Sequence, residues 1–248
     1  MADLADVITM QHYQSSSLTI ESKPDLTPVT EADRAAEQAL RAVLAEQRPL
    51  DDILGEEFGA SAETSTRRWI IDPIDGTKNY VRGVPVWSTL IALTIDAIPV
   101  LGVVSAPALA RRWWAATGDG AWTTALGSSA KAISVSAVAN IEDASFSYSD
   151  AIGWKERGAL IGLERLNSTT WRQRAYGDFW SHMLVAEGAI DVSAEPELGA
   201  WDMAALIPII TEAGGKATAF DGGPALEGGC LVATNGILHG PVLDRLKP

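Results

Sequence analysis

The sequence predicts an α/β protein that is built in two lobes. Between about residues 87 and 123 the apolar segments are short and follow one another, as antiparallel strands do. Beyond a weakly patterned stretch at 128–140, strands alternate with helices, which indicates a mixed sheet covered by helices. The length of 248 residues suffices for one large domain or two fused lobes. We expect an N-terminal α+β lobe over 1–135 and a C-terminal α/β lobe over 136–248.

The composition is that of an ordinary globular protein, with 47% hydrophobic and 21% charged residues. A net charge of -13 disfavours nucleic acids and anionic membranes as partners, because both require a basic patch. The acidic N-terminus does not resemble a signal peptide, and no apolar run approaches the length of a membrane span. Cys230 has no partner cysteine and reads as a small core residue. We expect a cytoplasmic protein.

The first 28 residues predict a helix followed by an irregular segment. Residues 2–13 have the pattern of an amphipathic helix. Residues 15–28 are polar and contain proline, which indicates a loop or an irregular hairpin, and Lys23 within it faces either solvent or a phosphate. The predicted inner positions of the helix are Leu4, Val7, Ile8 and Tyr13.

A second helix is predicted to begin after Thr30, which is a good N-cap residue. Asp33 stands three residues further on and nearly completes a capping box. An acid in the first turn also interacts favourably with the helix dipole, so Asp33 has a structural explanation. The functional alternative is that Asp33 orients a metal-bound water, and one carboxylate can do both.

Two acidic residues, Glu56 and Glu57, follow a short apolar run and are bounded by Gly55 and Gly59. Glutamates in an exposed turn are usually only solvated. However, the preceding glycine permits close backbone approach, and a glutamate at the edge of a strand can complete a metal site.

The segment 68–80 carries the strongest chemical signal in the chain. Residues 69–71 predict a buried strand that ends at Asp72, because Pro73 cannot continue a central strand. Asp75 follows, and Gly76 and Thr77 turn the chain with backbone N–H groups free to meet an anion. Two carboxylates beside such a turn suit Mg²⁺ holding a phosphate. The alternative is a plain turn, because Asp-Pro and Asp-Gly are common turn formers.

The remaining elements complete the two lobes. Antiparallel strands are expected at 87–94, 100–106, 112–116 and 121–123. In the second lobe we expect strands at 144–148, 189–194, 216–220 and 230–234, and helices at 150–163, 178–188, 201–213 and the C-terminus. Asp202, at the start of the helix 201–213, has the plain explanation of an acid that faces the helix dipole.

Four separated elements together resemble the inositol monophosphatase superfamily of Mg²⁺-dependent, lithium-sensitive phosphomonoesterases. They occur in the family's order and span most of the chain: 29–33, 55–57, 72–77, and 201–204 with 212–215 behind it. The resemblance implies a layered αβαβα phosphatase fold of the inositol monophosphatase and fructose-1,6-bisphosphatase type. The family is usually dimeric, so a homodimer is expected.

The resemblance also implies roles for individual residues. Glu56 and the Thr77–Asp33 pair would take a proton from a metal-activated water, which attacks phosphorus in line without a phosphoenzyme. Phosphate oxygens would meet the amides of Gly76 and Thr77, and Lys78 either contacts them or is a surface charge. Two to three Mg²⁺ ions, or Mn²⁺, are expected, with inhibition by lithium. Their ligands would be Glu56, Asp72, the Ile74 carbonyl, Asp75 and Asp202.

Within the superfamily, the stretches 75–87, 105–114 and 177–180 most resemble the bacterial (actinobacterial-type) histidinol-phosphatase branch. Inositol-type members usually have threonine at the position of Lys78, although lysine also occurs in nucleotide-bisphosphate branches. Hydrolysis of L-histidinol phosphate is therefore expected. Its amine and imidazole would be held by Asp178, Glu195 and Glu197.

Several alternatives stay open from the sequence. Trp87 or the Trp113–Trp114 pair would stack on imidazole, or belong to the core. Inositol monophosphate, a sugar phosphate or adenosine 3′,5′-bisphosphate are alternative substrates. A protein that binds divalent cations without catalysis is the alternative of another class, but it leaves Glu56 and Thr77 without a purpose.

Overall fold

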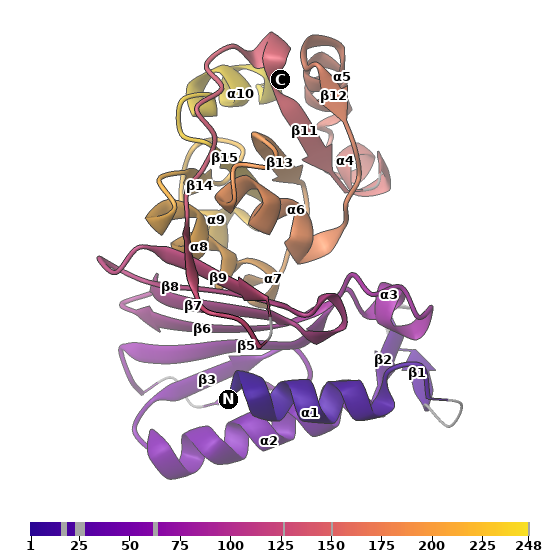
Figure 1. The fold of residues 1–248 in the computed structure, drawn as a ribbon, viewed down its shortest axis with the longest axis vertical. Coiled ribbons are helices and arrows are strands. Elements are labelled where there is room, and N and C mark those ends of the chain that lie inside the picture. Colours follow the sequence, from indigo (N-terminus) through magenta and orange to yellow (C-terminus); the bar gives the residue numbers. More distant parts are fainter. Residues whose placement is uncertain (16–18, 23–27, 62–63, 126, 150, 248) are drawn as a thin grey trace.

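The structure, a computed structural model, describes the chain except residues 16–18, 23–27, 62–63, 126, 150 and 248, so Lys23 lies outside the described residues. Two sheets alternate with three layers of helices (Figure 1). The predicted αβαβα architecture is confirmed.

The first sheet has eight strands in the order β10-β9-β8-β7-β6-β5-β3-β4. All neighbouring strands of this sheet pair antiparallel except β3 and β5, which pair parallel. The short strand β10 lies in the stretch expected to be weakly patterned, and it extends the sheet. The strands are β3 (Asp52–Gly55), β4 (Gly59–Ala60), β5 (Arg67–Asp75), β6 (Ser88–Ile95), β7 (Ile98–Ala106), β8 (Arg111–Ala116), β9 (Ala121–Ala125) and β10 (Lys131–Ile133).

One face of this sheet is covered by α1 (Ala2–His12) and α2 (Glu31–Gln47), which lie side by side in Figure 1. Between these helices the chain forms the hairpin of β1 (Ile20–Ser22) and β2 (Pro28–Thr30). The capping box predicted for α2 is present, because Thr30 and Asp33 exchange hydrogen bonds.

The inner face predicted for α1 is wrong at two positions. Leu4 and Val7 are 38% and 67% exposed, whereas Ala5 and Thr9 are fully buried. Small side chains let α1 pack closely against its neighbours, and the Thr9 hydroxyl donates to the Ala5 carbonyl within the helix (2.8 Å). Close approach of the backbone, rather than the largest apolar side chains, therefore decides which face is buried.

Strand β5 does not stop at Pro73 as predicted. It continues to Asp75, and its register with β6 shifts between Asp72 and Asp75. A bulge of this kind tolerates proline, because the residue there has no ladder partner for the missing N–H. The Thr89 hydroxyl donates to the Pro73 carbonyl (2.8 Å) and stabilises the irregular segment.

The second sheet has five strands in the order β12-β11-β13-β15-β14. It is mixed, as predicted, because β11 pairs parallel with β12 and β13, whereas β15 pairs antiparallel with β13 and β14. The strands are β11 (Ser145–Tyr148), β12 (Arg172–Gln173), β13 (Val192–Glu195), β14 (Lys216–Thr218) and β15 (Leu231–Thr234). Cys230, just before β15, is fully buried, in agreement with its predicted place in the core.

Helices fill the space between the sheets and cover the outer face of the second sheet (Figure 1). The middle layer consists of α6 (Asp178–Ala186), α7 (Ala200–Met203) and α8 (Leu206–Glu212). The others are α3 (Thr77–Val81), α4 (Ala151–Glu156), α5 (Leu160–Thr169), α9 (Ala225–Gly228) and α10 (His239–Leu246).

Two helices predicted as continuous are broken. The expected helix 150–163 is split into α4 and α5 at Gly158, which has a φ of +73°. The expected helix 201–213 is split into α7 and α8. Pro208 has no N–H to donate to the carbonyl four residues earlier, so the helical ladder is interrupted near Ala204.

The two sheets fall on opposite sides of residue 135 in the sequence. However, one hydrophobic cluster contains residues from both halves, among them Trp113 of β8, Phe179 of α6 and Leu206 of α8. The division into lobes at residue 135 stays a prediction. Among the described helices, none combines the length and the apolar character that a membrane span requires.

Candidate metal and substrate site

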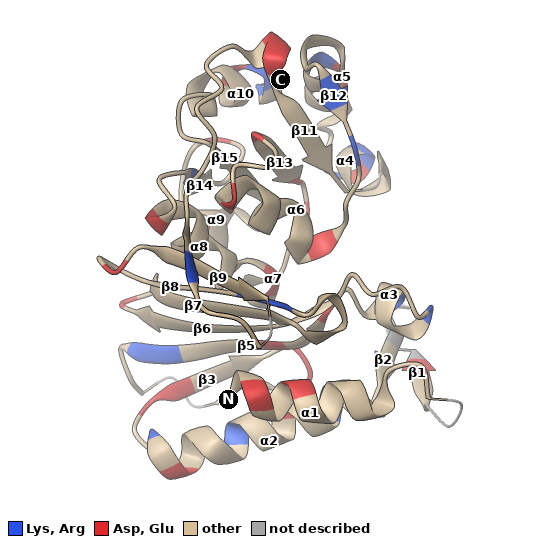
Figure 2. Ribbon diagram, in the orientation of Figure 1, with Lys and Arg blue, Asp and Glu red and all other residues tan. Residues whose placement is uncertain are grey.

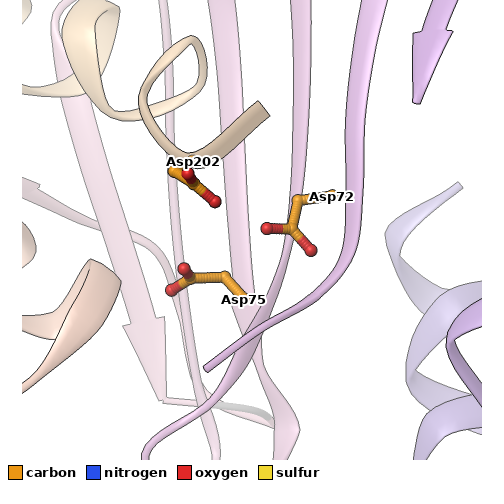
Figure 3. Close-up of side chains that lie close together, drawn as sticks. All are labelled: Asp72, Asp75 and Asp202. Atoms are coloured by element: carbon orange, nitrogen blue, oxygen red, sulfur yellow. The ribbon is translucent and has the colours of Figure 1, made fainter. Parts of the chain in front are cut away.

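Three carboxylates meet between the first sheet and the middle helices. One ligand oxygen from each of Asp72, Asp75 and Asp202 lies within 4.8 Å of the others. Figure 3 shows these side chains pointing toward one another, two from β5 and one from α7. The bulge in β5 places Asp72 and Asp75 together. Asp202 is held in the first turn of α7, where its Oδ2 accepts the Gly199 N–H (2.6 Å).

The electrostatics of this cluster favour a cation. Burial raises the pKa of Asp72 and of Asp75 well above the ordinary value, and the negative charges around them raise it further. Burial likewise raises the pKa of Asp202 to about 7, although the bond from Gly199 opposes the shift. Buried carboxylates that repel one another and offer only oxygen atoms are the donor set that Mg²⁺ and similar hard cations prefer. The residues present therefore fit a divalent metal ion.

Glu56 adjoins the three aspartates. Its backbone N–H donates to the Ile71 carbonyl on β5 (3.1 Å), which fixes its residue beside the strand that carries Asp72. Its charge raises the pKa of Asp72 and of Asp202, so its carboxylate lies close to both. The structure therefore brings Glu56 to the cluster, as the resemblance implies.

Asp33 and Thr77 do not form the expected hydrogen bond. Asp33 Oδ2 accepts the Thr30 N–H (2.8 Å) and hydroxyl (2.6 Å), because it serves the capping box of α2. The Thr77 hydroxyl instead donates to the Ile74 carbonyl (3.0 Å), the carbonyl that the resemblance assigns to a metal. Asp33 Oδ1 is buried and has no hydrogen-bond partner within the described part of the chain. Burial raises the pKa of Asp33 to about 7.

The turn after the bulge requires glycine at position 76. Gly76 has a φ of +82°, and a Cβ there would lie 3.0 Å from both the Val86 carbonyl oxygen and Asp178 Oδ2. Thr77 and the exposed Lys78 follow in α3 and line the same cavity as Gly76. The predicted phosphate-binding residues are therefore adjacent to the carboxylate cluster.

A cavity of about 850 Å³ opens beside the cluster. The three predicted substrate residues line it: Asp178 is half-buried, Glu195 is buried in β13, and Glu197 is exposed. In Figure 2 the beginning of α6 is among the red, acidic segments. The predicted site residues that line the cavity are Glu56, Asp75, Gly76, Thr77, Lys78, Asp178, Glu195, Glu197 and Asp202.

Asp178 is held in place by a side chain from the other half of the sequence. Asn79 Nδ2 donates to Asp178 Oδ2 (2.9 Å) and to the Val86 carbonyl (2.9 Å). Burial and the charge of Glu195 together raise the pKa of Asp178 to about 6, although the charge of Lys78 opposes the shift. The two carboxylates thus form an acidic wall of the cavity.

His182, which was not predicted from the sequence, is 1% exposed and lines this cavity. Its Nε2 lies 3.5 Å from Glu195 Oε1, without hydrogen-bond geometry. His182 could have been found from its position four residues after Asp178, because this spacing places both side chains on one face of α6.

The expectation that Trp87 or Trp113 stacks on the substrate is wrong. Both are fully buried in hydrophobic clusters, Trp87 against Tyr80 and Trp113 against Phe179, so the alternative of a place in the core is confirmed. Trp114 lies against a different cavity, beside the start of α1. The tryptophan that does line the substrate cavity is Trp201.

The fold and the site are those of a phosphomonoester hydrolase, and the model of the inositol monophosphatase family matches residues 2–246, so this chain belongs to that family. It is 54% identical to a histidinol-phosphatase of Mycobacterium tuberculosis, over 100% of this chain and 95% of the relative. It is also 54% identical to a histidinol-phosphatase of Streptomyces coelicolor, over 100% of this chain and 94% of that protein. Among solved structures, the extragenic suppressor protein suhB of Bartonella henselae superposes with a TM-score of 0.88 at 28% identity, covering 99% of this chain and 95% of that one.

Proposed function

We propose that this protein is a Mg²⁺-dependent phosphomonoesterase that hydrolyses L-histidinol phosphate to L-histidinol and phosphate in histidine biosynthesis. The observation that carries the proposal is the position of an acidic wall, Asp178 and Glu195, beside a cluster of metal-type carboxylates. L-Histidinol phosphate has an imidazole at one end, a phosphate ester at the other, and a cationic amine on the carbon between them. The full-length identity of 54% to two histidinol-phosphatases supports the same substrate.

The metal would be held by Glu56, Asp72, the Ile74 carbonyl, Asp75 and Asp202, with two to three Mg²⁺ ions in the active site. Bound Mg²⁺ supplies charge neutralisation for the phosphate and lowers the pKa of a coordinated water. We expect Mn²⁺ to replace Mg²⁺ and lithium to inhibit.

The chain's own residues would bind the phosphate and move the proton. The amides of Gly76 and Thr77 would donate to phosphate oxygens, with Lys78 adding a positive charge. Glu56 and Asp33 would accept the proton of the attacking water. Attack by water in line needs no phosphoenzyme, and the buried Cys230 is poorly placed to be a nucleophile.

The acidic wall would select the alcohol. Asp178 and Glu195 would accept charge-assisted hydrogen bonds from the amine or the imidazole N–H, and Glu197 would contribute at the exposed rim. Carboxylates also accept hydrogen bonds from hydroxyl groups, so myo-inositol 1-phosphate is the alternative substrate. The homodimer and the cytoplasmic location stay predictions.

A crystal structure with Mn²⁺, phosphate and L-histidinol would test this assignment. We expect anomalous signal among Asp72, Asp75 and Asp202, and the amine of L-histidinol within hydrogen-bond distance of Asp178 or Glu195. An amine that points to solvent while phosphate occupies the Gly76–Thr77 turn would overturn the substrate assignment.

A further inference from the structure

One buried charge next to the site has no place in the proposed chemistry. Glu37 lies in the second turn of α2 and is fully buried. Its Oε2 accepts the Glu57 N–H (2.7 Å), and its Oε1 accepts the Phe58 N–H (3.2 Å). Arg41, one helical turn further on, donates from Nε to Oε1 (2.7 Å) and balances the charge.

The fit of this carboxylate against the backbone is close. A Cβ built on Gly55 would lie 1.9 Å from Glu37 Oε1, so the glycine makes room for the carboxylate. Arg41 also donates from Nη2 to the Gly59 carbonyl, at the far end of the turn. Two side chains of α2 therefore hold the whole turn 55–59 against the helix.

Glu56 is the residue that this arrangement fixes. On one side its own N–H is bonded to Ile71 of β5, and on the other side the next N–H is bonded to Glu37. The peptide groups flanking Glu56 are thus tied to two different elements. This fixes the direction in which the Glu56 side chain leaves the backbone, and that side chain lines the cavity.

We propose that Glu37 is a positioning residue, which holds Glu56 in the geometry needed to bind the metal and accept the proton. The inference rests on the role proposed above for Glu56. A carboxylate is required at position 37, because all of its partners are donors. In the variant E37Q, either orientation of the amide would place an NH₂ group against an N–H, so at least one bond must be lost.

The chain offers a matched control in Asp52, at the other end of β3. Its buried Oδ2 accepts two backbone N–H groups, from Thr64 and Ser65 (2.9 Å each). In D52N the amide oxygen can accept both of these N–H groups while the NH₂ group faces the Thr64 hydroxyl, so the bonds can be kept. The variant therefore removes a buried negative charge from a neighbouring turn that does not carry Glu56. If only the charge of Glu37 mattered, E37Q and D52N would behave alike.

The test compares E37Q, D52N and the unsubstituted protein, each corrected for its folded fraction. We expect E37Q to lower kcat by about 10–100-fold, as loss of a residue that orients a metal ligand does, with little change in KM. The dissociation constant for Mn²⁺, measured without substrate by electron paramagnetic resonance, should rise by a similar factor. Amide hydrogen exchange at Glu57 and Phe58 should accelerate. D52N should keep kcat and the Mn²⁺ affinity.

Equal kcat and equal Mn²⁺ affinity in E37Q and D52N would overturn the inference. If E37Q does not fold, E37D takes its place, since it keeps both oxygens and withdraws them by one methylene. Absence of turnover in the unsubstituted protein would contradict the proposed function alone, and Mn²⁺ binding would then decide the role of Glu37.

Discussion

The backbone N–H of Phe179 donates to Asp75 Oδ2 across 2.9 Å, although the two residues are 104 positions apart. This bond joins the first turn of α6 to the bulge of β5. Because Asp178 immediately precedes Phe179, the bond also sets the distance between the acidic wall and the carboxylate cluster. The parts proposed to recognise the alcohol and to bind the metal are therefore directly linked, although they come from different halves of the chain.

Replacing Asp75 with asparagine should abolish turnover while the fold is retained. Asparagine keeps an oxygen that can accept the Phe179 N–H, but it loses the charge that would bind the metal. We expect kcat/KM to fall about 1,000-fold, which corresponds to several kcal/mol of lost charge stabilisation. In EDTA the free energy of unfolding should be unchanged or higher, because one of the mutually repelling charges is gone. D244N, in an exposed ion pair with Lys247, is the control and should keep full activity. An active D75N would remove Asp75 from the metal site.

The acidic wall should act on cationic substrates selectively. We expect D178N and E195Q each to raise KM for L-histidinol phosphate by about 10–100-fold, the worth of a hydrogen bond to a charged group. The KM for a phosphomonoester of an uncharged alcohol, such as β-glycerol phosphate, should change little. Steady-state kinetics on both substrates provide the comparison. Equal losses on the two substrates would mean that the wall supports the metal cluster rather than the alcohol.

The metal-free protein should lose stability as the pH rises. The pKa is raised to about 7 for Asp33 and Asp202 and to about 6 for Asp178, all well above the ordinary value of an aspartate. The folded state therefore binds more protons than the unfolded state between these values, and the free energy of unfolding falls through that window. In EDTA, thermal denaturation should give a higher Tm at about pH 5 than at about pH 7.5, and Mg²⁺ should raise Tm more at the higher pH. A Tm in EDTA that rises over this range would contradict the burial of these charges.

Close packing between the first sheet and the middle helices can be tested at Gly102 of β7. A Cβ there would lie 2.0 Å from the Ala205 carbonyl oxygen, a backbone atom with no freedom to move aside. G102A should lower the free energy of unfolding by about 1–3 kcal/mol or more, measured by denaturant titration. Gly240 has open space around its Cβ position, so G240A is the control. If the two variants were equally stable, α8 would not pack on β7 as described.

The parts of the site that could be predicted from sequence are those whose residues lie close together in the chain. Asp72 and Asp75 are only three residues apart in the chain, so their proximity could be predicted from sequence. Asp202 could be assigned only through the family resemblance, because no local pattern connects an acid at a helix start to a strand so far away. The bond between Phe179 and Asp75 uses a backbone group and leaves no trace in residue type.

The wrong predictions about the fold have a common physical cause, which is tertiary packing. The burial of Ala5 rather than Leu4 depends on how closely α1 approaches its neighbours, which hydrophobic periodicity does not encode. The continuation of β5 through Pro73 depends on a bulge against β6. Likewise, the expected bond between Thr77 and Asp33 is replaced because the capping box and the Ile74 carbonyl compete for the same groups.

The central claim is that a metal-type carboxylate cluster and an acidic wall act together on a phosphate ester of a cationic alcohol. The most direct measurement is phosphate release from L-histidinol phosphate and from myo-inositol 1-phosphate, side by side, with Mg²⁺ and with EDTA. We predict turnover that requires Mg²⁺ and strongly favours L-histidinol phosphate. A preference for myo-inositol 1-phosphate would contradict the role of Asp178 and Glu195, and turnover that persists in EDTA would contradict the metal site.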